Sequence, residues 1–117
     1  MASDYSDIQV LKKGYIEKLK ELDEVVKEYY SQVQASADKE FIYRRAKAKE
    51  YTALLAADTK VTVIGALVDG AVAKDRADFK IAEGIVKAIK ENIKRLHKNI
   101  DAYQTLISLA KTEINIK

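Results

Sequence analysis

In FKIAEGIVKAIKENIKRLHKNIDAYQTLISLAKTEI, residues 79–114, apolar side chains recur in alternating steps of three and four residues. This spacing places them on one narrow face of an α-helix and predicts that the helix packs against another helix. Because such a face needs only apolar side chains, it predicts architecture and leaves function open. We call it the apolar seam, and it consists of Phe79, Ala82, Val86, Ile89, Ile93, Leu96, Ile100, Tyr103, Ile107, Ala110 and Ile114.

The composition is that of long helices. The chain has 117 residues, 48% of them hydrophobic, with no proline and only four glycines, and Ala, Glu, Lys, Leu and Ile dominate it. A chain of this length forms one domain by default. Cysteine is absent, so neither a disulfide framework nor a thiolate metal site is available. We therefore expect a single all-α domain, 1–117.

A first helix is predicted from about residue 7 to about residue 57. Apolar residues follow one another at helical spacing between Ile8 and Val33. The small, polar segment 34–39 is a candidate break, but no glycine or proline enforces one there. One continuous helix and a helix broken near 34–39 both fit, because an apolar face resumes with Phe41, Ala48, Tyr51 and Leu55.

The connection is predicted between residues 58 and 71. A short helix over about 62–69 fits, with Gly70 as its left-handed C-terminal residue. The β-branched run at 61–64 also fits a short strand, although nothing else in the chain offers that strand a partner. The last helix is predicted over about 72–114.

Two long helices joined by a short connector form an antiparallel hairpin. With the turn centred near residue 65, residue 43 would lie beside residue 87. Further apolar residues flank the main faces, among them Ile81, Ile85, Leu106 and Leu109. An apolar face of this width is typical of bundles with three or four helices, so we expect a homo-oligomer, most simply a dimer that forms a four-helix bundle.

Basic residues gather, in this register, around the middle of the hairpin. Residues 58–117 carry eleven Lys and Arg against eight Asp and Glu, and therefore hold the whole net charge of +3. Such a belt is a candidate phosphate-binding surface for nucleic acid, although a solvated helix face is the more common explanation, because exposed lysines are frequent. The candidate residues are Arg44, Arg45, Lys47, Lys87, Lys90, Lys94, Arg95 and Lys98.

No catalytic, cofactor-binding or metal-binding residues are predicted. His97 is the only histidine, and the positions three and four residues away supply only one carboxylate, at Asp101. The glycines of GALVDG, residues 65–70, lack the Gly-Lys-Ser/Thr of a phosphate-binding loop. Gly84 lies inside the predicted last helix, at a cost of about 1 kcal/mol relative to alanine, and we interpret it as a point of close approach for another helix.

No apolar run in the sequence approaches the roughly 18 residues of a membrane span, and the first seven residues are polar. We therefore expect no membrane partner and a cytoplasmic location.

Residues 57–88, ADTKVTVIGALVDGAVAKDRADFKIAEGIVKA, followed by DAYQTLISLAKTE at residues 101–113, resemble small helical proteins of bacteriophage recombination and replication gene clusters. The similar part covers about half the chain and consists of a short helix, an alanine-rich start and a long seam-bearing helix. The resemblance implies a phage or prophage accessory protein of the host cytoplasm, and it transfers no catalytic residues.

These observations favour a non-enzymatic helical protein that binds another protein. The alternative is a nucleic-acid-binding accessory protein that uses the basic belt. An enzyme with a carboxylate site is the least favoured of the three.

Overall fold

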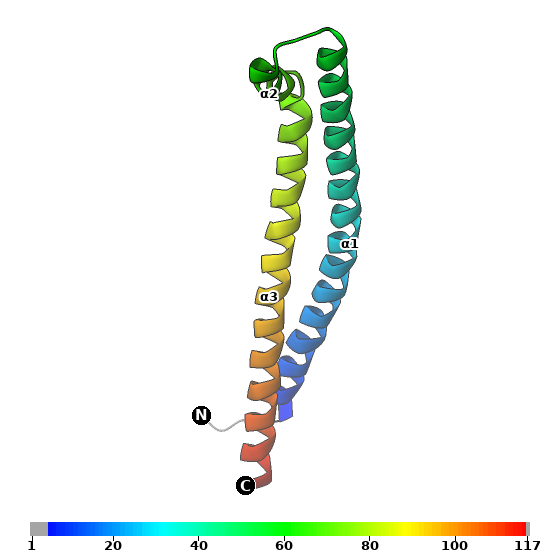
Figure 1. The fold of residues 1–117 in the computed structure, drawn as a ribbon. Coiled ribbons are helices and arrows are strands. Elements are labelled where there is room, and N and C mark those ends of the chain that lie inside the picture. Colours follow the sequence, from blue (N-terminus) through cyan, green and yellow to red (C-terminus); the bar gives the residue numbers. More distant parts are fainter. Residues whose placement is uncertain (1–4, 117) are drawn as a thin grey trace. The chain divides into compact units, whose positions relative to one another are not determined.

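The computed structural model describes residues 5–116, which form three α-helices and no strand (Figure 1). They are α1 (Tyr5–Ala56), α2 (Val61–Ala71) and α3 (Ala73–Ile116). The predicted all-α hairpin is confirmed, since α1 packs against α3 and the short α2 lies in the connection between them. α1 continues without a break through residues 34–39, as the lack of glycine and proline there allows.

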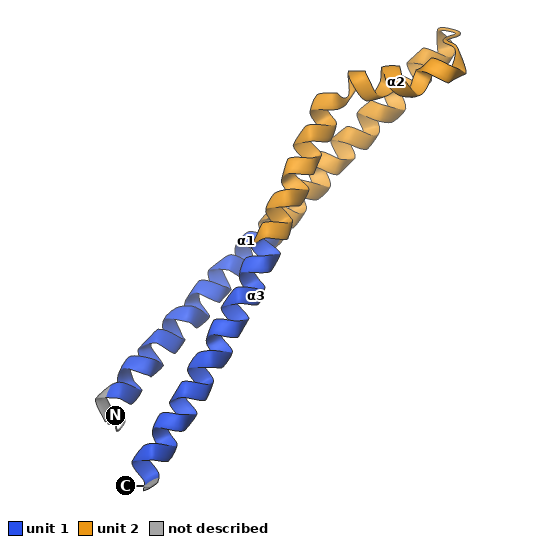
Figure 2. Ribbon diagram, turned by 90° about the vertical axis from the view of Figure 1, so that its left-hand side faces the viewer, with its two compact units in different colours: residues 1–29, 89–117 blue, residues 30–88 orange. Residues whose placement is uncertain are grey.

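The chain divides into two compact units, which Figure 2 shows in different colours. Unit 1 pairs the N-terminal part of α1, up to Tyr29, with the part of α3 that begins at Ile89. Unit 2 is continuous in sequence, from Tyr30 to Ala88, and contains the rest of α1, all of α2 and the start of α3. In each unit the α1 and α3 segments run in opposite directions (Figure 2).

Unit 1 is held together by apolar side chains of both helices. Leu96 is completely buried, and Ile8 and Ile100 are also buried. A polar contact joins the same helices, because Nε2 of Gln104 donates a hydrogen bond of 3.2 Å to the Tyr15 hydroxyl. Every residue of the apolar seam, in both units, is buried or half-buried.

The core of unit 2 lies where α2 meets α1. Ile64, Val68 and Val72 form a buried cluster, against which Tyr43, Ala46 and Leu54 pack. The Tyr43 ring also stacks on Phe79 of α3, with ring centroids 6.0 Å apart and an interplanar angle of 21°. Tyr43 thereby links α1 to both of the other helices.

The chain reverses at residues 57–60, directly after α1. Asp58 has φ 56°, the left-handed conformation common just beyond a helix end. The Asp58 N–H donates to the Leu55 carbonyl at 3.2 Å and the Thr59 N–H to the Leu54 carbonyl at 3.1 Å, the two bonds of a Schellman motif. These bonds satisfy backbone carbonyls that the end of α1 would otherwise leave without partners.

The prediction that Gly70 ends the short helix in a left-handed conformation is wrong. Gly70 lies inside α2, and no glycine of the described chain has a positive φ. α2 instead ends at Ala71 and is capped by Val72, whose N–H donates to the Val68 carbonyl at 3.0 Å and whose carbonyl accepts from the Arg76 N–H at 2.9 Å. Backbone hydrogen bonds therefore continue from α2 into α3 across the bend that separates them (Figure 1).

The predicted register of the hairpin is also wrong. It placed residue 43 beside residue 87, whereas Tyr43 stacks on Phe79, about two helical turns earlier in α3. The reason is that the chain reverses at 57–60 rather than near 65, so that α2 still packs along α1. Arg44, Arg45 and Lys47 therefore lie nearer to the start of α3 than the predicted register places them.

Gly14, rather than Gly84, is the glycine of close approach. A Cβ atom built at Gly14 would lie 2.7 Å from the Tyr103 ring, whereas one built at Gly84 meets no described atom within 4 Å beyond its chain neighbours and the backbone of its own helix. In unit 1 the Tyr103 ring therefore occupies the space that a side chain at position 14 would need.

Replacement of Leu96 by alanine tests the core of unit 1. We expect L96A to lower the free energy of unfolding by about 2–5 kcal/mol, the usual cost of truncating a buried leucine. Leu106→Ala is the matched control, because Leu106 lies on the same helix but is 48% exposed, and it should cost less than about 1 kcal/mol. Urea unfolding followed by circular dichroism measures both, and equal losses would contradict the described packing.

A second pair of variants tests the two glycines of the long helices. Gly84→Ala should raise the free energy of unfolding by about 1 kcal/mol, because alanine is the better helix former and position 84 has room for it. Gly14→Ala gains the same propensity but places its methyl group against Tyr103, so we expect a smaller gain or a net loss. Thermal unfolding of both variants under one set of conditions shows which variant is more stable. If G14A is the more stable, Gly14 is not a point of close approach for the Tyr103 ring.

Candidate interaction surfaces

The part of α1 in unit 2 carries an apolar stripe that no other part of the described chain covers. Tyr30 is 68% exposed, Phe41 65%, Leu55 48% and Tyr51 45%. We call this face the outer stripe. Its members recur in steps of three or four residues, all of them are exposed, and they are Tyr30, Val33, Ala37, Phe41, Arg44, Ala48, Tyr51 and Leu55.

The face of the same helix segment that turns toward α2 and α3 is smaller and more polar. It contains Gln32, Ser36 and Glu50, which are half-buried, as well as Tyr43, Ala46 and Leu54. The apolar face that resumes with Phe41, Ala48, Tyr51 and Leu55 belongs to one continuous helix, but it does not turn toward α2 or α3. These four side chains point to solvent.

Different spacings of the apolar face of α1 and the apolar seam of α3 explain why these side chains lie on the outside. From Ile8 to Leu55 the apolar positions of α1, with Arg44 among them, advance by thirteen steps over 47 residues, about 3.6 residues per step. The apolar seam advances by ten steps over 35 residues from Phe79 to Ile114, or 3.5 per step. The two patterns diverge by about 20° per heptad, so the α1 positions that begin buried at Ile8 end on the outside.

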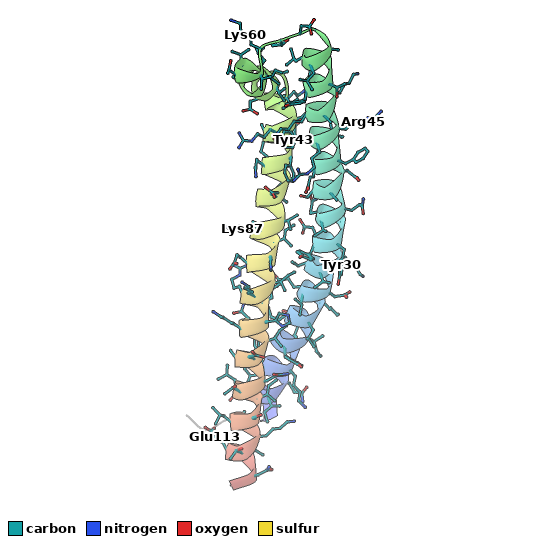
Figure 3. All side chains as sticks on the ribbon, in the orientation of Figure 1. Tyr30, Tyr43, Arg45, Lys60, Lys87 and Glu113 are labelled. Carbon is teal, nitrogen blue, oxygen red and sulfur yellow. The ribbon has the colours of Figure 1, made fainter. Side chains whose placement is uncertain are left out.

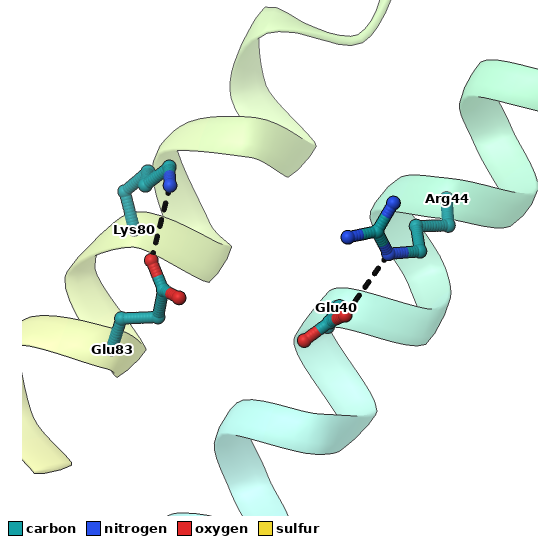
Figure 4. Close-up of polar contacts among 4 residues, drawn as sticks. All are labelled: Glu40, Arg44, Lys80 and Glu83. Carbon is teal, nitrogen blue, oxygen red and sulfur yellow. Dashed lines mark hydrogen bonds and ion pairs between the residues drawn. The ribbon is translucent and has the colours of Figure 1, made fainter.

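Charged side chains border the outer stripe on both sides. Nε of Arg44 donates to Oε1 of Glu40 at 2.9 Å (Figure 4), and Oδ1 of Asp38 accepts from Gln34 at 3.0 Å. Arg45 has no ion pair among the described residues, and it lies on the side of α1 that points away from α3 (Figure 3). The Nζ atom of Lys47 lies 5.9 Å from the centroid of the Tyr43 ring.

A shallow hollow lies on the outer stripe. It is lined by Ala37, Glu40, Phe41, Arg44 and Arg45, so one aromatic ring, one carboxylate and two guanidinium groups meet there. A hollow of this make-up, formed on one helix, fits a side chain from another helix better than it fits a small molecule.

The predicted phosphate-binding residues fall into two groups. Arg44, Arg45, Lys47 and Lys87 belong to unit 2, whereas Lys90, Lys94, Arg95 and Lys98 belong to unit 1. All eight side chains are exposed, and Figure 3 shows Lys87 on the side of α3 that faces away from α1.

Several of these basic side chains form ion pairs or hydrogen bonds with neighbouring residues of their own helix. Besides the pair of Arg44 with Glu40, Nζ of Lys94 lies 3.3 Å from Oε1 of Glu91, and a guanidinium nitrogen of Arg95 donates to Asn92 at 2.6 Å. In unit 2, Lys80 of α3 likewise pairs with Glu83 at 3.1 Å (Figure 4). Arg45, Lys87, Lys90 and Lys98 have no such partner in the part of the chain that the structure describes.

A second apolar surface of unit 2 is formed by α1 and α3 together. Ile81 and Ile85 of α3 are exposed, and they line a groove together with Gln32, Ala35 and Lys39 of α1. Leu106 and Leu109 of α3 are likewise exposed in unit 1. The hairpin thus leaves these flanking residues uncovered.

The described residues bring together no group of three His, Cys, Asp or Glu side chains suited to a metal ion. His97 is exposed, beside Lys94 and Lys98 in a shallow hollow of α3. Within residues 5–116 no helix is long and apolar enough to cross a membrane.

The outer stripe is the surface that sequence reasoning missed. A signal for it exists in the sequence, namely the difference between the 3.6-residue spacing of α1 and the 3.5-residue spacing of the apolar seam. No family model, no curated protein and no solved structure matches this chain.

Proposed function

We propose that this protein is a non-enzymatic helical docking protein, which binds another protein through the outer stripe of α1. The observation that supports this proposal is the stripe itself, an uncovered row of large apolar side chains that recur every three or four residues along one helix. Apolar surface of this extent, rimmed by charges, is typical of a site of protein interaction. The accessory role in a phage or prophage, which the resemblance of residues 57–88 implies, stays a prediction.

The energetics indicate what the partner must supply. Burial of the five large apolar side chains of the stripe, each about half exposed, releases roughly 5 kcal/mol. Association costs about 4–15 kcal/mol, so a flat polar surface would not bind. We therefore expect the partner to present an apolar stripe of its own, as one helix presents to another in a coiled coil.

Nucleic-acid binding is a second candidate function. The exposed Lys87, Lys90 and Lys98 of α3 and Arg45 of α1 favour it, because they have no ion pair within the described chain and can therefore neutralise phosphates. We rank this function below protein docking, since Lys94 and Arg44 already pair with carboxylates of their own helix.

A photo-reactive phenylalanine analogue at position 41 tests the docking function. Expressed in the native host, this full-length chain should give covalent adducts with protein on irradiation, because Phe41 lies at the centre of the outer stripe. The same analogue at position 87, on the basic face of α3, is the matched control and should give few adducts. Denaturing electrophoresis and mass spectrometry measure the adducts.

A second variant makes the same test specific to the stripe. Tyr51→Glu, which places a charge on the outer stripe three turns from the probe, should reduce the adducts at position 41 at least fivefold. Lys87→Glu should leave them unchanged. Equal adducts from positions 41 and 87, or adducts that Y51E does not reduce, would refute the docking proposal.

A gel-shift titration with single- and double-stranded DNA at about 50 and 200 mM salt tests the second candidate. If the basic residues bind phosphates, affinity falls steeply with salt, and Lys87→Ala and Lys98→Ala each weaken binding by a similar factor on every sequence. Lys80→Ala is the control, because Lys80 is already paired with Glu83. The absence of binding at the lower salt concentration removes this function.

A further inference from the structure

We propose that the occupant of the outer stripe is the outer stripe of a second copy of this chain, and that the two α1 helices pair antiparallel. This inference rests on the proposed docking function and names its partner. A second copy supplies what the energetics require, an apolar stripe of the same length and spacing. Residues 30–55 span between three and four heptads, about 39 Å, which is enough for a specific two-helix contact.

The arrangement of residues in the stripe fixes the centre of the pairing between residues 42 and 43. In that register the large side chains at the two ends meet, Tyr30 of one copy with Leu55 of the other. The two small residues also meet, Ala37 with Ala48. Small side chains opposite one another let the helix backbones approach closely, and the large ends close the contact on either side.

Charge complementarity across the stripe supports the same register. In an antiparallel pair each flank of the stripe faces the same flank of the other copy. On one flank Glu40 then lies opposite Lys47 of the second copy, and on the other flank Asp38 lies opposite Arg45. By symmetry this makes four pairs of opposite charge.

The groups that would form these pairs have unused capacity in the single chain. Arg45 and Lys47 have no ion pair among the described residues. Glu40 uses only Oε1, in its bond to Arg44, and Asp38 uses only Oδ1, in its bond from a neutral amide. Glu40 and Asp38 therefore gain these contacts without breaking their own hydrogen bonds inside the chain.

A shift of the register by one heptad in either direction is unfavourable. One shift places Glu40 opposite Glu40 and Asp38 opposite Asp38 of the second copy. The opposite shift places Lys47 opposite Lys47 and Arg45 opposite Arg45. Like charges at these positions repel, so the sequence selects one of the three registers.

The parallel orientation is unfavourable as well. In an in-register parallel pair each residue of the stripe meets its own copy, so that two Arg44 guanidinium groups would face each other at the interface. In the antiparallel pair Arg44 lies opposite Phe41, where the guanidinium group can rest on the face of the ring. The shallow hollow beside Phe41 and Arg44 is the place where these two side chains of the second copy would enter.

Cysteine cross-linking of the full-length chain tests the pairing directly, because the chain contains no cysteine of its own. We expect a mixture of Ala37→Cys and Ala48→Cys chains to form a disulfide-linked dimer under mild oxidation. Neither variant alone should do so, since the two copies of residue 37 lie about 16 Å apart in the antiparallel pair, beyond the reach of a disulfide. Non-reducing electrophoresis gives the result.

Sedimentation equilibrium of the purified wild-type chain accompanies this experiment and should show twice the monomer mass of 13.2 kDa. Arg45→Glu should raise the dissociation constant of the dimer about tenfold, because both symmetry-related pairs are lost. Asp38→Arg in the same chain should return the dissociation constant to the wild-type value, because the charge pair is formed again with its signs exchanged. Lys87→Glu, on α3 and away from the stripe, is the matched control and should have no effect.

A wild-type chain that stays monomeric throughout the micromolar range overturns the inference. So does a disulfide in the A37C chain alone, which would indicate a parallel pair. Neither result touches the proposed function, which fails only if the probe at position 41 gives no stripe-dependent adduct with any protein. Adducts with a different protein, together with a monomeric purified chain, would keep the docking function and refute self-pairing.

Discussion

Contact between the apolar seam of α3 and α1 is the constraint on which the rest of the molecule depends. The seam keeps a spacing of 3.5 residues from Phe79 to Ile114, and so it can be covered only by a helix that follows it along a left-handed path. Near Ile8, apolar side chains of α1 cover the seam. Farther along the chain, α1 turns more polar residues toward α3. The outer stripe is the direct result, because the apolar positions of α1 that no longer face α3 lie on its solvent side.

Unit 2 compensates for this weak α1 face with α2. Between Tyr43 and Leu54 the inward side of α1 offers few large apolar side chains, and the buried cluster of Ile64, Val68 and Val72 supplies them from the other side. This explains why the chain reverses as early as residues 57–60. Because the chain turns early, the eleven residues of α2 pack along α1. If α1 continued instead, it would present only a polar face to α3.

Much of the fold could be predicted from the sequence, because helix type and seam position follow from composition and spacing. The helical hairpin and the long last helix are of this kind. The register could not be predicted, since it depends on where the turn lies, and the turn is made by Asp58 in a left-handed conformation that residue type alone signals weakly. The difference between the two apolar spacings signals that an outer stripe exists, but which residues form it could not be assigned, for a related reason. Apolar residues such as Phe41 fit the inside and the outside of a helix equally well until the partner helix is placed.

The packing of Gly14 against Tyr103 also explains how two nearly uniform helix surfaces keep their alignment in unit 1. No buried polar or charged side chain exists among the described residues to lock one helix against sliding past the other. A slip of one heptad would bring the Tyr103 ring against position 7 or position 21, where aspartate or glutamate stands in place of glycine. The absence of a side chain at Gly14 thus leaves space that the Tyr103 ring can occupy in only one register of the two helices.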